Sequence, residues 1–128
     1  MKSRDSLIRL KRFHADEKRR QVAQMEAMIA EFERMAKELD DQILAEQERS
    51  GIHDAGHFAY PTFAKAAMQR RDNLKTSADD MRAQLAAAAA ERDAAAAELE
   101  KAEAIAERDG IAEKSAAHAG QRGLAAAR

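Results

Sequence analysis

The stretch SGIHDAGHFAYPTF, from Ser50 to Phe63, decides the fold, because its composition differs from that of the long stretches on either side. It holds the single Pro, the single Tyr, two of the five Gly and two of the four His. Gly permits positive φ, and Pro is favoured at the first position of a helix. The stretch therefore predicts a bend over residues 50–60 between two long helices.

The overall composition predicts a coiled coil. The chain has 128 residues, of which 35% are charged and 4% aromatic, and much of its 45% hydrophobic content is Ala. This balance is typical of long helices with heptad patterns. The absence of Cys excludes disulfides, thiolate nucleophiles and Cys-ligated zinc. No apolar run approaches the ~18–20 residues of a membrane span or forms a signal peptide, so we expect a soluble cytoplasmic protein.

The first helix is predicted over about residues 4–49, where neither Gly nor Pro interrupts the chain. Its apolar residues recur at alternating steps of three and four, which is the heptad signature of a coiled-coil seam. The a positions are Val22, Ile29, Ala36 and Ile43, and the d positions are Met25, Phe32 and Leu39.

The first twenty residues interrupt the phase of this seam. Leu7 and Leu10 lie one residue out of register with the later frame, and Lys11 and Lys18 fall where d residues belong. We therefore expect this segment to be helical but poorly specified as a seam.

The second helix is predicted over about residues 61–109, beginning at Pro61, with Thr62 as a rival cap. Its seam is lighter than the first, because most of its members are Ala. The seam residues are Ala64, Ala67, Arg71, Leu74, Ala78, Met81, Leu85, Ala88, Arg92, Ala95, Leu99, Ala102 and Ala106. Gly110 is the expected stop. Residues 111–128 form an Ala-rich tail, expected to be frayed or disordered.

The two seams predict an all-α, antiparallel two-helix coiled-coil hairpin. If paired residue numbers add to 110, large side chains mostly meet small ones, as close packing prefers. The basic first twenty residues then lie beside the acidic segment 76–109. A register seven residues longer is a second possibility. A parallel dimer is a third, but it would place equal charge blocks side by side.

No catalytic, cofactor or metal site is predicted, so we do not expect an enzyme. His53, Asp54 and His57 lie close together in the sequence, but a Gly falls between the two His and no third strong ligand is near. The Ser residues are scattered along helices, where two helices form no pocket. There is no Gly-rich phosphate loop.

Three aromatic residues in the bend allow two interpretations. Phe58, Tyr60 and Phe63 could cap the end of the two-helix core, or form an exposed hydrophobic patch for a partner. The two roles are compatible with each other.

The basic run RLKRFHADEKRR, Arg9 to Arg20, is a weak candidate for contact with nucleic acid or anionic lipid. Acidic residues interrupt the run, and the chain has a formal net charge of −1, which argues against a dedicated nucleic-acid binder. We expect neither nucleic-acid binding nor insertion into a membrane.

Two longer segments resemble a known family. The segments SRDSLIRLKRFHADEKRRQVAQ (residues 3–24) and HFAYPTFAKAAMQRRDNL (residues 57–74) are similar to the flagellar export protein FliJ family, in its alphaproteobacterial form. The resemblance covers roughly residues 2–108. The start LxRLKRF…DEKRR and the turn FAYPTF are its most distinctive parts. The Ala-rich tail departs from the family pattern.

The resemblance implies a small, non-enzymatic, two-helix coiled coil of the flagellar type III export apparatus, which serves bacterial motility. Members of the family act as a stalk that binds the export ATPase and promotes assembly of its ring. They also contact the cytoplasmic domain of the export gate and help to cycle export chaperones. The expected location is cytoplasmic, peripherally associated with the inner membrane at the flagellar base.

Two candidate contact sites follow from the hairpin and this resemblance. The first is the free end of the hairpin, where we expect the ATPase to contact Leu7, Arg9, Leu10, Arg12 and Phe13. The second is the aromatic turn, as a site for the export gate or another partner. The alternative function is a generic cytoplasmic coiled-coil scaffold or chaperone-like binder outside the flagellum.

Overall fold

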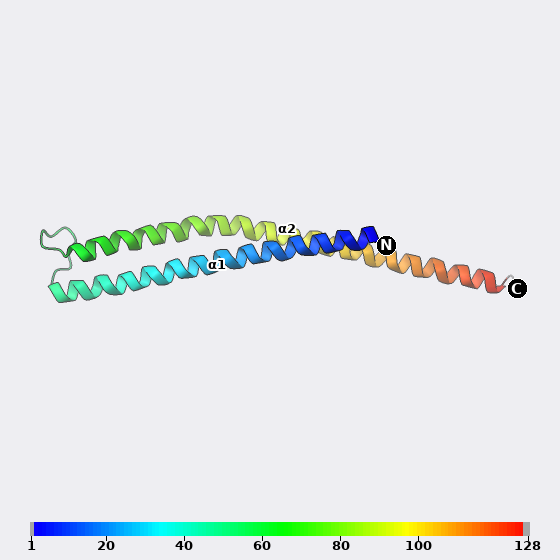
Figure 1. Cartoon of the computed structure of the whole chain (residues 1–128), viewed down its shortest axis with the longest axis horizontal. Helices are drawn as coiled ribbons and strands as arrows, with labels where there is room; N and C mark the ends of the chain where they lie inside the picture. Colours follow the sequence, from blue (N-terminus) through cyan, green and yellow to red (C-terminus); the bar gives the residue numbers. More distant parts are fainter. Residues whose placement is uncertain (1, 127–128) are drawn as a thin grey trace. The chain divides into compact units, whose positions relative to one another are not determined.

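The protein folds as a hairpin of two long helices, as predicted (Figure 1). The computed structural model describes residues 2–126, and the side chains of residues 3–120. Helix α1 spans Lys2–Ser50 and α2 spans Thr62–Ala126, and no strand occurs among the described residues. The helices form two compact units. Unit 1 combines α1 up to Arg19 with α2 from Ala90 onward, and unit 2 spans Arg20–Ala89.

The seam of unit 2 confirms the predicted heptad frame. Its buried residues are Val22, Ile29, Ala36 and Ile43 of α1, and Ala64, Ala67, Ala78 and Ala88 of α2. The predicted d residues Met25, Phe32 and Leu39 are half-buried, as are Leu74, Met81 and Leu85 opposite them. Burial of these apolar side chains is the main force that holds the two helices together here.

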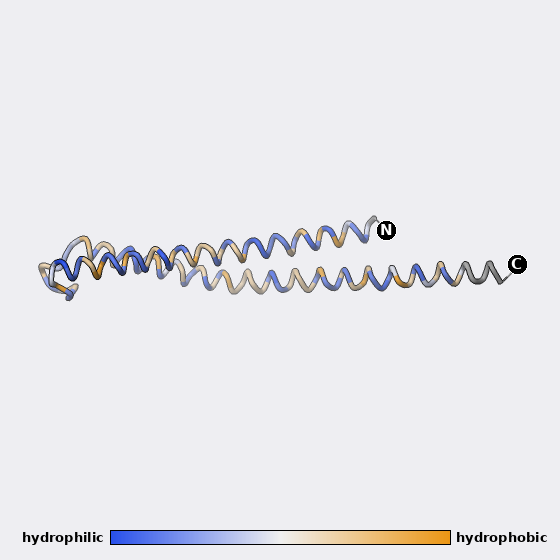
Figure 2. Tube along the Cα trace, turned by 90° about the horizontal axis from the view of Figure 1, so that it is seen from below, coloured by the Kyte–Doolittle hydropathy of each residue, from blue (hydrophilic) through white to orange (hydrophobic). Residues whose placement is uncertain are grey.

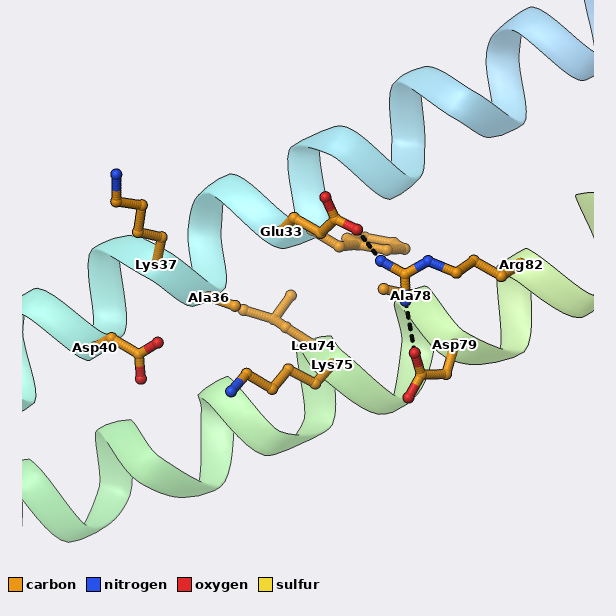
Figure 3. Close-up of a pocket in the computed structure, with 10 residues that line it drawn as sticks. Glu33, Ala36, Lys37, Asp40, Leu74, Lys75, Ala78, Asp79 and Arg82 are labelled. Atoms are coloured by element: carbon orange, nitrogen blue, oxygen red, sulfur yellow. Dashed lines mark hydrogen bonds and ion pairs between the residues drawn. The ribbon is translucent and has the colours of Figure 1, made fainter.

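The register of unit 2 agrees with the antiparallel docking predicted from the sequence. Ala36, Leu74 and Ala78 line one groove between the helices (Figure 3). The Arg71 Nη1 donates to the Asp40 Oδ1 at 2.9 Å, and these residue numbers add to 111, against the 110 expected. This hydrogen bond raises the pKa of Arg71, although its partial burial acts in the opposite direction.

Unit 1 corrects the predicted break in the seam. Ala15 is buried and Ile8 is half-buried, at seven-residue steps before Val22, while Leu7 and Leu10 are exposed. The seam therefore keeps its phase into the first turns of α1. The predicted slip of the phase was wrong, because Ala suffices at a seam position where the opposing helix is also Ala-rich. The positions of Leu7 and Leu10 outside the frame are confirmed.

The first helix ends at a glycine cap. Gly51 has φ +74° and its N–H donates to the Gln47 carbonyl at 2.8 Å, a left-handed cap that Gly adopts without steric cost. The Ser50 hydroxyl donates to the Gln47 carbonyl at 3.2 Å and accepts from the Ile52 N–H at 3.2 Å. The carbonyl of Gln47, in the last turn of α1, thus accepts two hydrogen bonds.

Two consecutive turns carry the chain from α1 to α2. The His57 N–H donates to the Asp54 carbonyl at 3.0 Å, and the Tyr60 N–H donates to the His57 carbonyl at 3.0 Å. The first bond of α2 runs from the Lys65 N–H to the Pro61 carbonyl at 3.1 Å. The helix therefore begins at Thr62, one residue after the predicted start, with Pro61 as its cap.

The prediction that the second helix stops at Gly110 was wrong. The helix continues to Ala126, so the tail expected to be frayed or disordered is helical over residues 111–126, and residues 127 and 128 lie outside the described part of the chain. A helical Gly costs about 1 kcal/mol relative to Ala. The Arg4 guanidinium lies 3.7 Å from Asp109 and 3.6 Å from Glu113, one on each side of the glycine, and these ion pairs connect α1 to this part of α2. Residues 111–120 are exposed.

Short hydrophobic stretches alternate with hydrophilic ones along both helices (Figure 2). As a result, no helix within residues 2–126 is both long and apolar enough to cross a membrane.

Candidate functional site: an apolar outer face on unit 1 and an aromatic turn

The first candidate site is an exposed apolar stripe near the start of α1. Leu7, Leu10 and Phe13 follow one another at three-residue steps, and Leu10 and Phe13 are 63% and 60% exposed. Three-residue steps keep side chains on one side of a helix. Ser6 and Arg9 flank the stripe and line a shallow groove with Leu10 and Phe13. An apolar surface of this kind is available to a partner.

Arg12 differs from the other predicted members of this site, because it contacts the second helix. Its Nη2 donates to the Glu103 Oε1 of α2 at 3.1 Å. Arg12 therefore joins the two helices of unit 1, whereas Leu7, Leu10 and Phe13 remain exposed. Of the five predicted residues, the structure brings Arg9, Leu10 and Phe13 together in one groove, places Leu7 one turn before Leu10, and pairs Arg12 with the second helix.

The basic segment of α1 lies against the acidic segment of α2. Within unit 1, Lys18 Nζ lies 2.8 Å from Glu91 Oε2, and Lys11 Nζ lies 3.5 Å from Glu98 Oε2. These residue numbers add to 109, which agrees with the predicted register. The two pairs place a carboxylate beside two of the six cations in the run Arg9 to Arg20, which weakens its attraction for a nucleic acid or an anionic lipid.

The pair between Lys18 and Glu91 affects the titration of the carboxylate. The hydrogen bond from Lys18 lowers the pKa of Glu91, with help from the charges of Lys18 and His14. Lys11 and Lys18 occupy d positions, and their stems run along the seam while their ammonium groups reach the acids at its edge. Unit 1 therefore has ion pairs where unit 2 has large apolar side chains.

The second candidate site, the aromatic turn, divides into a buried and an exposed part. Tyr60 is 7% exposed, and its hydroxyl accepts from the Gln47 Nε2 at 2.8 Å and lies 3.4 Å from the Met68 Sδ. Phe58 is 97% exposed and stacks only on His57, with 4.7 Å between ring centroids. Phe63 is also exposed. Tyr60 caps the core, and the two Phe rings face solvent.

The polar residues of the turn hold the backbone. The Asp54 Oδ1 accepts from the Gly56 N–H at 2.9 Å, and the His57 Nδ1 accepts from the Ala59 N–H at 3.0 Å. Such side-chain to backbone bonds are typical of turns. Within the part of the chain that the structure describes, no group of three His, Cys, Asp or Glu residues is arranged to hold a metal ion.

Comparison with protein-family models, with curated proteins and with solved structures finds no match to this chain.

Proposed function

We propose that this protein is a non-enzymatic component of the flagellar type III export apparatus, a coiled-coil stalk that binds the export ATPase and promotes assembly of its ring. The proposal rests on the resemblance of residues 3–24 and 57–74 to the FliJ family. The observation that carries it is the exposed stripe of Leu7, Leu10 and Phe13, which lies in the first of these segments.

The arrangement of unit 1 supports a contact through this stripe. Cross-helix ion pairs and the small seam residues Ala15 and Ala95 hold the two helices together on the inner side. The stripe lies outside that seam, so a partner can bind it without separating the helices. Phe13 is of a type enriched in protein interfaces, and the two Leu side chains add apolar area beside it.

A titration into the cognate export ATPase tests the proposal, with ATP hydrolysis and ring size followed together. We expect both to rise with the wild-type chain. The double variant Leu10→Asp with Phe13→Asp should lose both effects, because two charges cannot enter an apolar interface. Helicity should persist by circular dichroism, since both side chains are exposed.

The matched control for this titration is Leu44→Asp, which places the same charge at an exposed Leu of unit 2. It should behave like the wild type. Equal activity of the double variant and the wild type, or no wild-type effect on the ATPase, would overturn the proposed role at the ring. The search would then turn to the export gate and to export chaperones.

The aromatic turn is the proposed contact for the export gate or an export chaperone. Phe58→Ser with Phe63→Ser should weaken that binding. Phe58→Ser alone, which lies outside the side of unit 2 described below, should weaken it and leave thermal stability nearly unchanged, because that ring is 97% exposed. Tyr60→Ser should mainly lower stability, since Tyr60 is buried and hydrogen-bonded to Gln47. Binding that survives loss of both Phe rings would exclude the turn as the contact.

A generic coiled-coil scaffold outside the flagellum is the second candidate function. One observation favours it: a side of unit 2 with few charges, described below, offers a binding surface away from the stripe of Leu7, Leu10 and Phe13. If partners bind that side while the Leu10 and Phe13 variant behaves normally, the scaffold explains the protein better than the stalk.

A further inference from the structure

The two sides of unit 2 have opposite chemical character. Each side is a groove between α1 and α2, and Leu74 contributes to both. We call one the charged flank, defined by Glu33, Lys37, Asp40, Lys75, Asp79 and Arg82. We call the other the neutral flank, defined by Met28, Met35, Gln42, Phe63, Ser77 and Gln84.

The ion pairs of the charged flank form within one chain, and two of them join its two helices. Arg82 of α2 forms an ion pair with Glu33 of α1 and donates to the Asp79 Oδ1 at 2.6 Å (Figure 3). Asp40 accepts from Arg71 across the helices. Charges at the edge of a two-helix seam are the usual arrangement, because they keep it soluble and fix its pairing.

The neutral flank lacks this arrangement. Its six residues occupy seam-edge positions where charges are normally found, yet all six are uncharged and exposed. The same rows carry a charge only at Arg49 and Arg70 within unit 2. Met28 and Met35 on α1 and Phe63 on α2 are large and apolar. Met35 also lines a groove with Leu39 and Leu74 of the seam.

An apolar third position in each heptad changes what a helix can pack against. Helices with apolar a and d positions alone suit a two-stranded seam, whereas a further apolar g position widens the face to that of a helix in a bundle. In the part of α1 that belongs to unit 2, Met28 and Met35 occupy this third position. The neutral flank therefore has the pattern of a surface that other helices cover.

Only two charges border the groove of the neutral flank, and they have opposite signs. Glu38 of α1 and Arg70 of α2 both line it. Arg70 makes no ion pair within the described part of the chain, and Glu38 is paired only with Arg34 of its own helix. A surface that carries one acid and one base side by side is complementary to a second copy of itself.

We propose that the protein forms a homodimer in which the neutral flanks of two copies pack face to face as a four-helix bundle. The two-fold axis runs along the hairpin of unit 2, so that α1 of each copy lies over α2 of the other. Residues at one level then meet: Glu38 of one copy faces Arg70 of the other, and Met35 faces Ser77. Every neighbouring pair of helices is antiparallel.

Size complementarity and area agree with this arrangement. The large Met35 meets the small Ser77, as interdigitation requires. The α1 part of unit 2, from Arg20 to Ser50, is about 45 Å long at about 1.5 Å per residue, and two helices abreast are about 20 Å wide. The resulting face, about 900 Å² per copy, reaches the about 800 Å² per partner of a standard interface.

The interface uses no residue of unit 1. The dimer is thus independent of the proposed contact with the export ATPase, and the failure of one proposal leaves the other standing.

The first test is the mass of the full chain in solution, by sedimentation and light scattering over a range of concentrations. We expect a dimer that dissociates on dilution. Met28→Glu with Met35→Glu should weaken it at least about tenfold, because both carboxylates would be buried without partners. The control Leu44→Glu adds a charge outside the flank and should leave the dimer intact. A wild-type monomer at every concentration would overturn the proposal.

The second test reports the arrangement and does not depend on the Glu variants folding. The native chain has no Cys, so any disulfide must join the engineered Cys residues of two chains. Met35→Cys and Ser77→Cys chains, mixed under mild oxidation, should form a disulfide-linked pair containing one chain of each. Preferential linkage of Met35→Cys chains to one another would contradict the arrangement and place α1 over α1.

Discussion

Units 1 and 2 share one heptad frame, but different forces hold their helices together. In unit 2 the α1 positions of the seam carry Val22, Ile29 and Ile43, which are buried against α2. In unit 1 the same frame carries Ala15 together with Lys11 and Lys18, whose ammonium groups pair with acids of α2. Burial is insensitive to salt and pH, whereas exposed ion pairs respond to both. The same heptad repeat therefore gives unit 2 a stability that depends mainly on burial, and unit 1 a stability that depends on salt and pH.

The largest effect should come from truncating the seam of unit 2. Ile43→Ala removes a side chain that is 4% exposed and should lower the free energy of unfolding by about 2–4 kcal/mol. Leu44→Ala removes a similar volume from a side chain that is 52% exposed, and should change it by less than about 0.5 kcal/mol. Urea unfolding followed by circular dichroism measures both. Equal losses would mean that burial in this seam does not hold unit 2.

Apolar side chains at the seam of unit 1 should remove much of the difference in stability between the two units. Lys11→Leu with Lys18→Leu places two Leu at d positions and should raise the free energy of local opening in unit 1 by about 1–2 kcal/mol. Hydrogen exchange measured by mass spectrometry resolves this segment from unit 2. Glu17→Leu, an exposed position of the same helix, should give no such protection. Unchanged exchange in the double variant would show that Lys at these positions costs nothing.

Added salt should change the rate of hydrogen exchange more in unit 1 than in unit 2, and this effect is smaller than the two above. Raising the salt concentration from about 0.1 M to about 1 M shortens the Debye length from about 10 Å to about 3 Å. Exchange in α1 before Arg19 should accelerate roughly threefold, because each exposed pair is worth no more than about 1 kcal/mol. Exchange between Arg20 and Ser50 should accelerate less, because buried apolar side chains hold this segment in addition to the ion pairs of Glu33 and Asp40. A uniform response of both segments would contradict an electrostatic origin for the cohesion of unit 1.

The smallest effect concerns the titration of Glu91. Lys18 lowers the pKa of this carboxylate in the folded state, so the stabilisation is present at neutral pH and is lost as the pH falls below the ordinary value of 4.5. Lys18→Gln should raise the pKa of Glu91 toward that value, as read by NMR. Lys101→Gln, which also removes one positive charge, should not. A Glu91 pKa unaffected by Lys18→Gln would show that the pair does not form in solution.

Periodicity made the fold predictable before the structure was known. The seven-residue repeat of Val22, Ile29, Ala36 and Ile43 predicted the buried stripe of α1, and opposite charge blocks predicted the antiparallel docking. The candidate sites were predicted less completely. Composition marks Phe58 and Tyr60 alike as aromatic turn residues, and no local signal says that one is exposed and the other buried.

The sequence by itself determined the two helices, the bend between them and the heptad positions of each seam, because each depends on local propensity or on a short repeat. It favoured one antiparallel register, and the structure decided between that register and the alternatives. Only the tertiary structure decided which side chains lie outside that seam. It kept Ala15 and Ile8 in the seam and left Leu7 and Leu10 exposed, and it carried α2 through Gly110. Those outcomes depend on what the opposing helix offers at each level, including the acids that pair with Arg4, and a single helix pattern does not contain that information.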